Sequence, residues 1–194
     1  MKTSDFDYHL PPELIAQTPV EPRDRSRLLV VDRKRGSFAH NIFSQLPRFL
    51  DPGDLLVCND SRVVPARLLG RKAGTGGKIE LLLLRPAGDG LWEVLVKPSR
   101  RLRPGAVFHL RGSRVESRES SCSEGGQIVK RTDAGTWLVR FDGAPDLEKL
   151  GQVPLPPYVR EPLADPERYQ TVYARARGSV AAPTAGLHFT PELL

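Results

Sequence analysis

The chain has 194 residues, of which 39% are hydrophobic and 27% are charged, and its formal net charge is +6. These values fit a globular protein that buries a substantial core. No apolar run approaches the roughly 20 residues needed to cross a bilayer, and the N-terminal ten residues lack the apolar region of a secretory signal. The two cysteines could form one disulfide, but their small number favours a reduced cytoplasmic protein. The scattered histidines show no zinc-ligand spacing, so we expect no metal.

The first 60 residues predict a mixture of helices and strands. Prolines open a short helix over residues 10–17. Residues 28–31 and 37–40 form the two arms of a hairpin. Apolar positions between 42 and 50 follow a helical spacing that a proline interrupts. Residues 54–60 then predict a second strand, whose apolar side chains and cysteine are buried and whose end is polar.

The central part of the chain has a different sequence pattern, which predicts short strands separated by turns that contain glycine. Alternating apolar residues predict strands at 63–71, 79–84, 92–96, 107–111 and 136–141. Many short strands with little helix indicate a small barrel or sandwich. Residues 112–126, rich in Ser, Glu and Arg, predict an exposed loop of low order.

The pattern of the first part returns near the C-terminus. Asp165-Pro166-Glu167 is a helix start, with an N-cap, a proline and an acid. The fold we predict is therefore an α/β domain (1–62 and 154–194) interrupted by an inserted small all-β barrel domain (63–153). Residues 190–194 resemble the first turn of another helix. We accordingly expect the C-terminal portion of the α/β domain to be missing.

Two stretches concentrate groups suited to binding and chemistry. Gly178–Thr190 consists mainly of Gly, Ala, Ser and Thr around one titratable group, His188. Small residues let a backbone approach a ligand closely, and an imidazole can titrate near neutral pH. Asn59-Asp60-Ser61-Arg62 offers an amide, a carboxylate, a hydroxyl and a guanidinium. Purely structural alternatives remain open: a tight loop with a structural histidine, and a turn capped by Asp60 and paired to Arg62.

Basic residues gather on the predicted barrel. Candidate contacts to nucleic-acid phosphates are Lys97, Arg100, Arg101 and Arg103. Such a cluster suits the phosphate backbone, which dominates nucleic-acid affinity. An ordinary solvated basic face is the alternative.

Two familiar catalytic patterns are excluded. Gly70–Lys78 is rich in glycine, but Lys72 stands where a phosphate loop has its first glycine, and Ile79 stands where it has a hydroxyl residue. It predicts a hairpin loop instead. Ser179 is not surrounded by the G-x-S-x-G pattern of a hydrolase nucleophile, which disfavours a small-molecule hydrolase.

Several motifs together resemble the S-adenosylmethionine:tRNA ribosyltransferase-isomerase family of queuosine biosynthesis. The most specific are Arg168-Tyr-Gln-Thr-Val-Tyr-Ala174 and the segment Gly178–Thr190 that follows it. The other matching stretches, in family order, are Phe6–Pro11, Glu13–Gln17, Arg23, Ser26–Leu29, Gly53–Val57, Asn59–Val63, Pro65–Leu68, Gly76–Lys78, Glu80 and Pro154–Tyr158. Similarity is weak mainly over residues 85–150.

The resemblance implies a two-domain architecture and a reaction. Members transfer the ribosyl part of S-adenosylmethionine, a co-substrate, to a 7-aminomethyl-7-deazaguanine base at the wobble position of a tRNA. The product is epoxyqueuosine, and adenine and methionine leave. The partners it implies are thus S-adenosylmethionine and tRNA carrying the precursor base, with no metal and no membrane, and with the oligomeric state left open.

The resemblance also assigns roles to individual residues. His188, with Asp60 as the second candidate, is the expected acid or base. The expected binding residues are Asn59, Ser61, Arg62, Arg67, Ala182, Pro183, Thr184, Gly186, Phe189 and Thr190. Ser61 departs from the threonine of other members, and those members continue well past the Thr190 motif. A non-catalytic, basic RNA-binding module or an inactive truncated form is the competing hypothesis.

Overall fold

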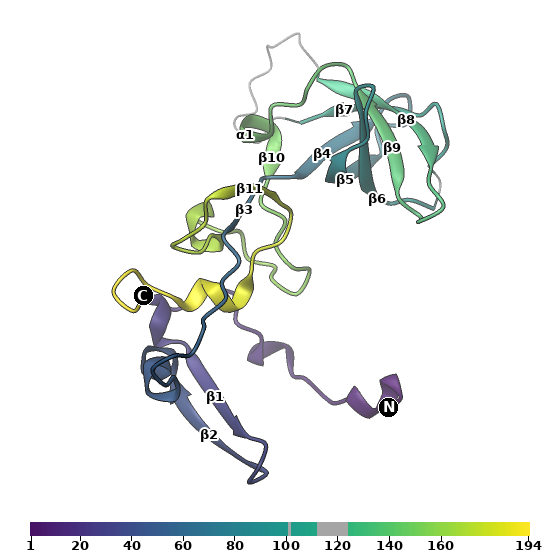
Figure 1. The fold of residues 1–194 in the computed structure, drawn as a ribbon. Helices are drawn as coiled ribbons and strands as arrows, with labels where there is room; N and C mark the ends of the chain where they lie inside the picture. The colour runs from purple at the N-terminus through teal and green to yellow at the C-terminus, as the bar shows by residue number, and fades with distance from the viewer. Residues whose placement is uncertain (101, 112–123) are drawn as a thin grey trace. The chain divides into compact units, whose positions relative to one another are not determined.

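The computed structural model describes residues 1–100, 102–111 and 124–194. These residues form two compact units (Figure 1). The first unit contains Met1–Ser61, Leu155–Ala176 and Ala182–Leu194, and the second contains Arg62–Pro154 and Arg177–Ala181. One unit thus interrupts the other in the sequence, as the fold class predicts. The exact domain boundaries at 62/63 and 153/154 stay a prediction.

The second unit is built around a β-barrel. Its sheet contains β4 (Arg67–Lys72), β5 (Lys78–Pro86), β6 (Leu91–Lys97), β7 (Val107–Leu110), β8 (Gly125–Arg131), β9 (Trp137–Phe141) and the short β10 (Gly151–Gln152). The strand order is β10-β4-β5-β6-β9-β8-β7, and β4 also pairs with β7. Six antiparallel strands therefore close on themselves, which confirms the predicted barrel.

Alternation along the strands fills the barrel with apolar side chains. The largest fully buried ones are Leu68, Leu81, Leu83, Val94, Phe108, Ile128 and Val139. Each such side chain contributes roughly 1.5–3 kcal/mol of hydrophobic free energy when it leaves water. At the closing seam, a Cβ on Gly70 would collide with the His109 carbonyl oxygen. Glycine at this position lets β4 approach β7 closely enough to pair with it.

The predicted strands agree with the barrel at most positions. The segment predicted at 63–71 is divided, because β3 (Ser61–Val63) ends before Pro65 and β4 begins after it. The sequence prediction missed β8, whose two initial glycines resemble a loop. The part of the predicted loop at 112–123 lies outside the described residues. A turn joins β4 to β5, so the glycine-rich stretch is a hairpin loop as expected.

The remaining elements of the second unit are short. Helix α1 (Leu147–Leu150) is capped by Asp146, whose carboxylate accepts from the Lys149 amide at 3.3 Å. Strands β3 and β11 (Ala176–Ser179) form a separate two-stranded sheet.

The first unit begins with short 3-10 helices and a hairpin. Strands β1 (Arg27–Asp32) and β2 (Ser37–Ile42) pair antiparallel from Arg27↔Ile42 to Asp32↔Ser37, as the sequence predicts. The 3-10 helices of this unit are η1 (Thr3–Phe6), η2 (Pro12–Leu14), η3 (Arg23–Arg25), η4 (Phe43–Phe49), η5 (Pro166–Tyr169) and η6 (Thr184–His188). The helix predicted at 10–17 is limited to η2, and the interrupted stripe at 42–50 becomes η4, with Pro47 inside it.

The predicted buried strand at 54–60 is wrong. Residues 54–60 form no strand, and Leu55 and Val57 are 87% and 83% exposed. Cys58 is exposed as well, contrary to the expectation that it is buried. An apolar run adopts strand structure only where another strand supplies its hydrogen bonds, and none of the described residues pairs with this one.

The C-terminal part of the first unit follows the predicted caps. The Asp165 carboxylate accepts from the Glu167 amide at 2.9 Å and starts η5. The Thr190 hydroxyl accepts from the Leu193 amide at 3.3 Å and starts the last turn. Over the described ranges, the structure contains no helix with the length and apolarity required to span a membrane.

Candidate functional site

The segment Gly178–Thr190, called the small-residue segment below, lies in the first unit from Ala182 onward, and this part is organised around Tyr173. Gly186, on η6, is buried, and a Cβ added to it would collide with the Tyr173 hydroxyl and crowd the Thr171 methyl group. The Tyr173 ring also packs against Phe189, with 6.2 Å between the ring centroids. Glycine at 186 therefore brings the segment directly against the residues that precede β11.

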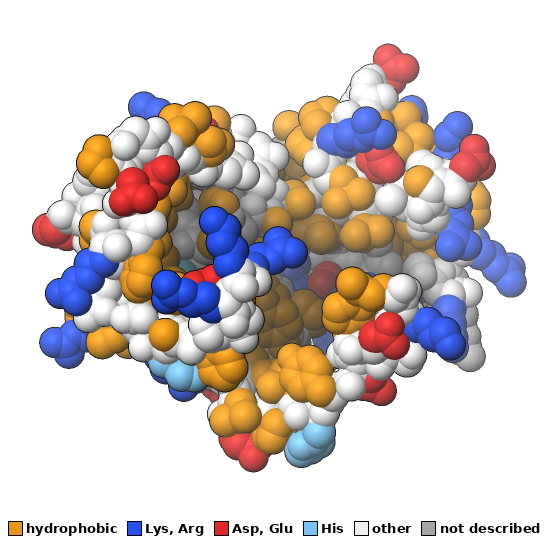
Figure 2. Space-filling view, turned by 60° about the horizontal axis from the view of Figure 1, so that its bottom comes forward, with side chains coloured by type: hydrophobic (Ala, Val, Ile, Leu, Met, Phe, Trp, Pro, Cys, Tyr) orange, Lys and Arg blue, Asp and Glu red, His pale blue; other side chains and the backbone are white. Residues whose placement is uncertain are grey.

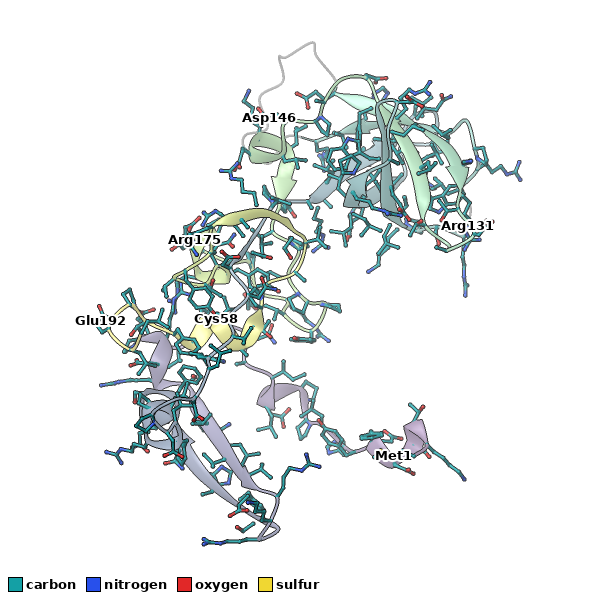
Figure 3. The ribbon with its side chains drawn as sticks, in the orientation of Figure 1. Met1, Cys58, Arg131, Asp146, Arg175 and Glu192 are labelled. Carbon is teal, nitrogen blue, oxygen red and sulfur yellow. The ribbon has the colours of Figure 1, made fainter. Side chains whose placement is uncertain are left out.

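Tyr173 also contacts Cys58, which follows the apolar run Leu55–Val57. Its hydroxyl is hydrogen-bonded to the Cys58 side chain, and burial is the main reason that its pKa is raised above 10.0. Figure 3 labels Cys58 near the yellow C-terminal segment that contains η6. Tyr173 thus joins the residues before Asn59 to the small-residue segment.

His188 lies in an aromatic environment. Its ring is 5.3 Å from that of Phe43, and Phe43 stands edge-on to Phe189 at 5.0 Å. His188 is half-buried, and desolvation lowers its pKa below 6.5. A cation loses more hydration on burial than a neutral ring, so the imidazole is mainly neutral at pH 7. A neutral imidazole can accept a proton, as a general base must.

Asn59, Asp60 and Ser61 form a turn with one ion pair. The Asn59 side-chain oxygen accepts from the Ser61 amide at 2.9 Å. The Asp60 carboxylate faces the Arg175 guanidinium at 3.4 Å, and this pair is largely solvent-exposed. The Asp60 carbonyl oxygen also accepts from the amides of Arg175 and Ala176. Asn59, rather than Asp60, therefore supplies the side-chain cap of this turn.

Arg62 and Arg67 belong to the second unit. The Arg67 guanidinium contacts the Glu80 carboxylate on the neighbouring strand at 2.9 Å, with both side chains about one-third exposed. This pairing gives Arg67 a structural role between β4 and β5.

The backbone of the small-residue segment is already partly engaged. A backbone hydrogen bond links Ala182 to the Tyr169 side chain. The Gly186 amide donates to the Pro183 carbonyl oxygen at 2.8 Å. Thr184 is exposed, whereas the Thr190 hydroxyl is used as a cap. Thr184 consequently offers the most accessible hydroxyl of this segment.

Arg23 fixes three backbone carbonyl groups around the site. Its guanidinium donates to the carbonyl oxygens of Gln170 at 2.6 Å, Glu167 at 3.1 Å and Leu187 at 3.4 Å. Burial, followed by the nearby Arg168 charge, lowers its pKa below the ordinary arginine value, but an arginine remains charged at neutral pH. Arg23 therefore connects η3, η5 and η6.

The basic residues predicted to contact RNA lie at the end of β6 and in the loop after it. Lys97 ends β6, and Arg100 and Arg103 precede β7. Lys97, Arg100 and Arg103 are exposed. Arg101 lies outside the described residues. Figure 2 shows Lys and Arg side chains distributed over the molecular surface between hydrophobic areas.

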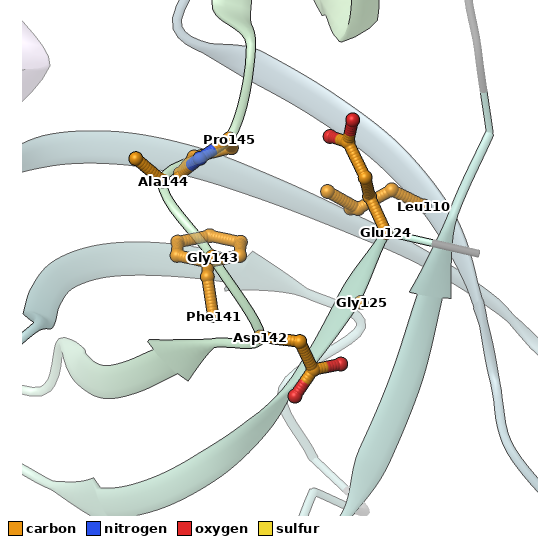
Figure 4. Close-up of a pocket in the computed structure, with 8 residues that line it drawn as sticks. All are labelled: Leu110, Glu124, Gly125, Phe141, Asp142, Gly143, Ala144 and Pro145. Atoms are coloured by element: carbon orange, nitrogen blue, oxygen red, sulfur yellow. The ribbon is translucent and has the colours of Figure 1, made fainter. Parts of the chain in front are cut away.

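A pocket of about 290 Å³ lies at one end of the barrel (Figure 4). The residues that line it are Leu110, Glu124, Gly125, Phe141, Asp142, Gly143, Ala144 and Pro145. Its two carboxylates make it unfavourable for phosphate. None of the residues predicted to bind a substrate lines this pocket.

Four residues with structural importance at the site were not singled out as site residues: Arg23, Phe43, Tyr173 and Arg175. Arg23 and Tyr173 do occur within motifs that carry the family resemblance, which is a usable signal. Phe43 and Arg175 are revealed only by their contacts with His188 and Asp60.

Fold and site define a two-unit protein, in which a closed β-barrel interrupts a unit that carries a half-buried histidine. The family described as "Queuosine biosynthesis protein" matches residues 3–194. The chain belongs to this family.

Curated relatives are similar over the whole chain. The S-adenosylmethionine:tRNA ribosyltransferase-isomerase of Dehalococcoides mccartyi strain CBDB1 is 55% identical over 196 residues, which cover 100% of this chain and 55% of that protein. The protein of the same name from Symbiobacterium thermophilum is 54% identical, again with 100% and 55% coverage. The chain thus spans about half the length of these relatives.

A solved structure is also similar in sequence. The S-adenosylmethionine tRNA ribosyltransferase of Thermotoga maritima is 36% identical, with 98% of this chain and 52% of that chain covered. The TM-score is 0.35, which does not establish a shared spatial arrangement.

Proposed function

We propose that the chain acts in the ribosyl transfer and isomerisation that forms epoxyqueuosine in tRNA. The observation that carries this proposal is the 55% identity, over the entire chain, to a relative named S-adenosylmethionine:tRNA ribosyltransferase-isomerase. S-adenosylmethionine would supply the ribosyl group to a 7-aminomethyl-7-deazaguanine base at the wobble position, and adenine and methionine would leave. The compartment that fits this reaction is the cytoplasm.

His188 is the proposed base. The sulfonium of S-adenosylmethionine acidifies the adjacent carbon, so a neutral imidazole can remove a proton there. The lowered pKa of His188 keeps the imidazole in this accepting form at neutral pH. The resulting imidazolium can later protonate the departing adenine, because the same group exchanges its proton in both directions.

Asp60 is the second candidate, with a different environment. The Asp60 carboxylate pairs with Arg175 and can also accept a hydrogen bond from ribose or a base. We propose binding roles for Asn59, Ser61, Arg62 and Arg67. The remaining proposed binding residues lie in the segment near His188: Ala182, Pro183, Thr184, Gly186, Phe189 and Thr190.

The barrel is the proposed tRNA-binding part. Lys97, Arg100 and Arg103 are exposed cations on one continuous stretch of chain, and Arg101 belongs to the same sequence cluster. Cations of this kind neutralise phosphates regardless of the base sequence. The target base itself would be recognised unstacked, as in most recognition of single-stranded RNA.

Adenine release tests the proposed reaction. The 194-residue chain is incubated with S-adenosylmethionine and with tRNA carrying the precursor base, and adenine is quantified by chromatography. Adenine should form only when both substrates are present, and His188→Ala should reduce its rate by at least about 100-fold. His40→Ala, on the exposed face of β2, is the matched control and should keep the rate.

The assay also distinguishes the competing hypothesis. Salt-dependent RNA binding without any adenine would indicate a binding module or a chain that needs further residues for chemistry. An unchanged rate in His188→Ala would remove His188 from the reaction.

A further inference from the structure

Leu55, Leu56 and Val57 form an apolar segment without a structural partner in the described part of the chain. Leu55 and Val57 are more than four-fifths exposed, and Leu56 is about half-exposed. The only described contact at its C-terminal side is the hydrogen bond between Cys58 and Tyr173. Hydrophobic side chains in a row are rarely left in water, because each can contribute roughly 1.5–3 kcal/mol when buried.

The sequence of this segment is typical of a buried strand. Leu-Leu-Val-Cys is apolar throughout and ends in the polar turn at Asn59. Strands that are buried on both faces have continuous apolar runs of this kind. The local preference and the observed exposure therefore disagree, and a missing neighbour resolves this disagreement without any change in the sequence.

The β1–β2 hairpin, which also belongs to the first unit, has a second exposed apolar face. Val31 pairs with Phe38, and Leu29 and Ile42 lie on the same face as this pair because side chains alternate along a strand. All four side chains are exposed. A two-stranded hairpin is marginally stable alone and normally packs one face against another element.

The length of the relatives indicates what covers these surfaces. Relatives with 54–55% identity match this chain over its full length, but the match covers only 55% of their own. Because the match covers the whole chain, those proteins have a segment aligned with Leu55–Val57. In each relative, the portion outside the match is therefore the part of the chain that can bury this segment.

We infer that Leu55–Val57 is a strand-forming segment that docks, as a β-strand, against a strand from the portion of the family's chains outside the matched half. Backbone hydrogen bonds to that strand would supply the affinity, and pockets for Leu55 and Val57 would fix its register. Because Cys58 and Asn59 follow directly, the docked strand would also hold the turn at Asp60 in place.

Hydrogen exchange measured by mass spectrometry tests this inference on folded proteins. Amides aligned with Leu55–Val57 should exchange at least about 100-fold more slowly in the full-length D. mccartyi relative than in the 194-residue chain. Amides of β5, within the barrel, serve as the control and should be protected in both proteins. Equally rapid exchange of the aligned segment in the relative would overturn the inference.

The alternative partner is a second copy of the chain. Hydrogen exchange measured at several protein concentrations tests for this self-association. Exchange at Leu55–Val57 in the 194-residue chain should be independent of protein concentration. Protection that increases with concentration would assign the segment to self-association and would also overturn the inference.

Paired substitutions provide an independent measurement. Leu55→Asp with Val57→Asp should shift the melting temperature of this chain by less than about 2 °C, because both side chains are already hydrated. The aligned substitutions should lower the melting temperature of the relative by more than about 5 °C, because they would bury two charges there. Leu95→Asp, at a half-exposed barrel position, is the control and should have similar effects in both proteins. Equal small shifts for the paired substitutions would contradict the inference.

Discussion

At the scale of single residues, the site depends on one titratable side chain and one glycine. His188 is half-buried against Phe43, and Gly186 is buried against Tyr173. Neither property follows from the residue type alone. Both give predictions that can be measured without the reaction.

The first prediction concerns the pH dependence of stability. Burial lowers the His188 pKa below its ordinary value of 6.5, so the unfolded chain binds a proton more readily than the folded one. The stability that His188 contributes is therefore complete above pH 6.5 and is lost as the pH falls through the lowered pKa. Urea unfolding at about pH 7.5 and about pH 5.5 should show a smaller pH effect in His188→Phe. An unchanged pH effect in this variant would contradict the burial of His188.

The second prediction concerns Gly186. Replacement by alanine should lower the free energy of unfolding by about 1–3 kcal/mol, because the new methyl group meets the Tyr173 hydroxyl and the Thr171 methyl group. Tyr173→Phe in the same chain should recover part of this loss, since it removes the nearest atom.

Gly143→Ala is the matched control. Its added methyl group would meet no atom within 4 Å, so we expect a change within about 0.5 kcal/mol. Urea denaturation followed by tyrosine and tryptophan fluorescence measures all these variants. Equal effects at positions 186 and 143 would contradict the close packing of Tyr173.

At the scale of elements, the side chain of Arg23 links three short 3-10 helices of the first unit. A three-residue helix such as η3 has too few internal bonds to be stable alone. Arg23 compensates by donating to carbonyl oxygens near η5 and within η6.

The third prediction follows from this arrangement. Arg23→Ala should lower the free energy of unfolding by about 2–3 kcal/mol, because three backbone carbonyl groups lose a charged donor. Arg23→Lys should recover little, since an ammonium cannot reproduce the planar geometry of the guanidinium. Arg25→Ala, in the same helix but exposed, should change stability by less than about 0.5 kcal/mol. Similar urea midpoints for the Ala variants at 23 and 25 would refute this role.

At the scale of the whole molecule, charge is the property that a nucleic-acid partner would detect first. The net charge of +6 is a bulk property, but three exposed cations lie close in sequence at the end of β6 and after it. Their contribution can be separated from general attraction by its dependence on salt.

The fourth prediction concerns this salt dependence. Replacing Lys97, Arg100 and Arg103 together by Gln should weaken tRNA binding, and the slope of log K against log salt should decrease in magnitude by about 2 if three phosphate contacts are lost. The control replaces Arg33, Lys34 and Arg35 in the β1–β2 turn by Gln, which changes the net charge by the same amount. Equal slopes for the two triple variants would show that only net charge matters.

The sequence determined those features that depend on neighbouring residues. Alternating residues such as Trp137, Val139 and Phe141 predict a strand with one buried face, and β9 has it. The caps at Asp165 and Thr190 are likewise set within three residues. Ordered motifs also indicated the family, because they preserve residue types that a fold class alone does not require.

Only the tertiary structure decided which distant residues meet. Gly186 needs to be small because Tyr173 lies against it, and the His188 pKa is lowered because its surroundings exclude water. The apolar run at Leu55–Val57 is a second example, because here the local sequence predicts a strand that the structure does not form. Its sequence specifies a strand, but burial requires a second strand, and the pairing of distant segments is not encoded in local periodicity.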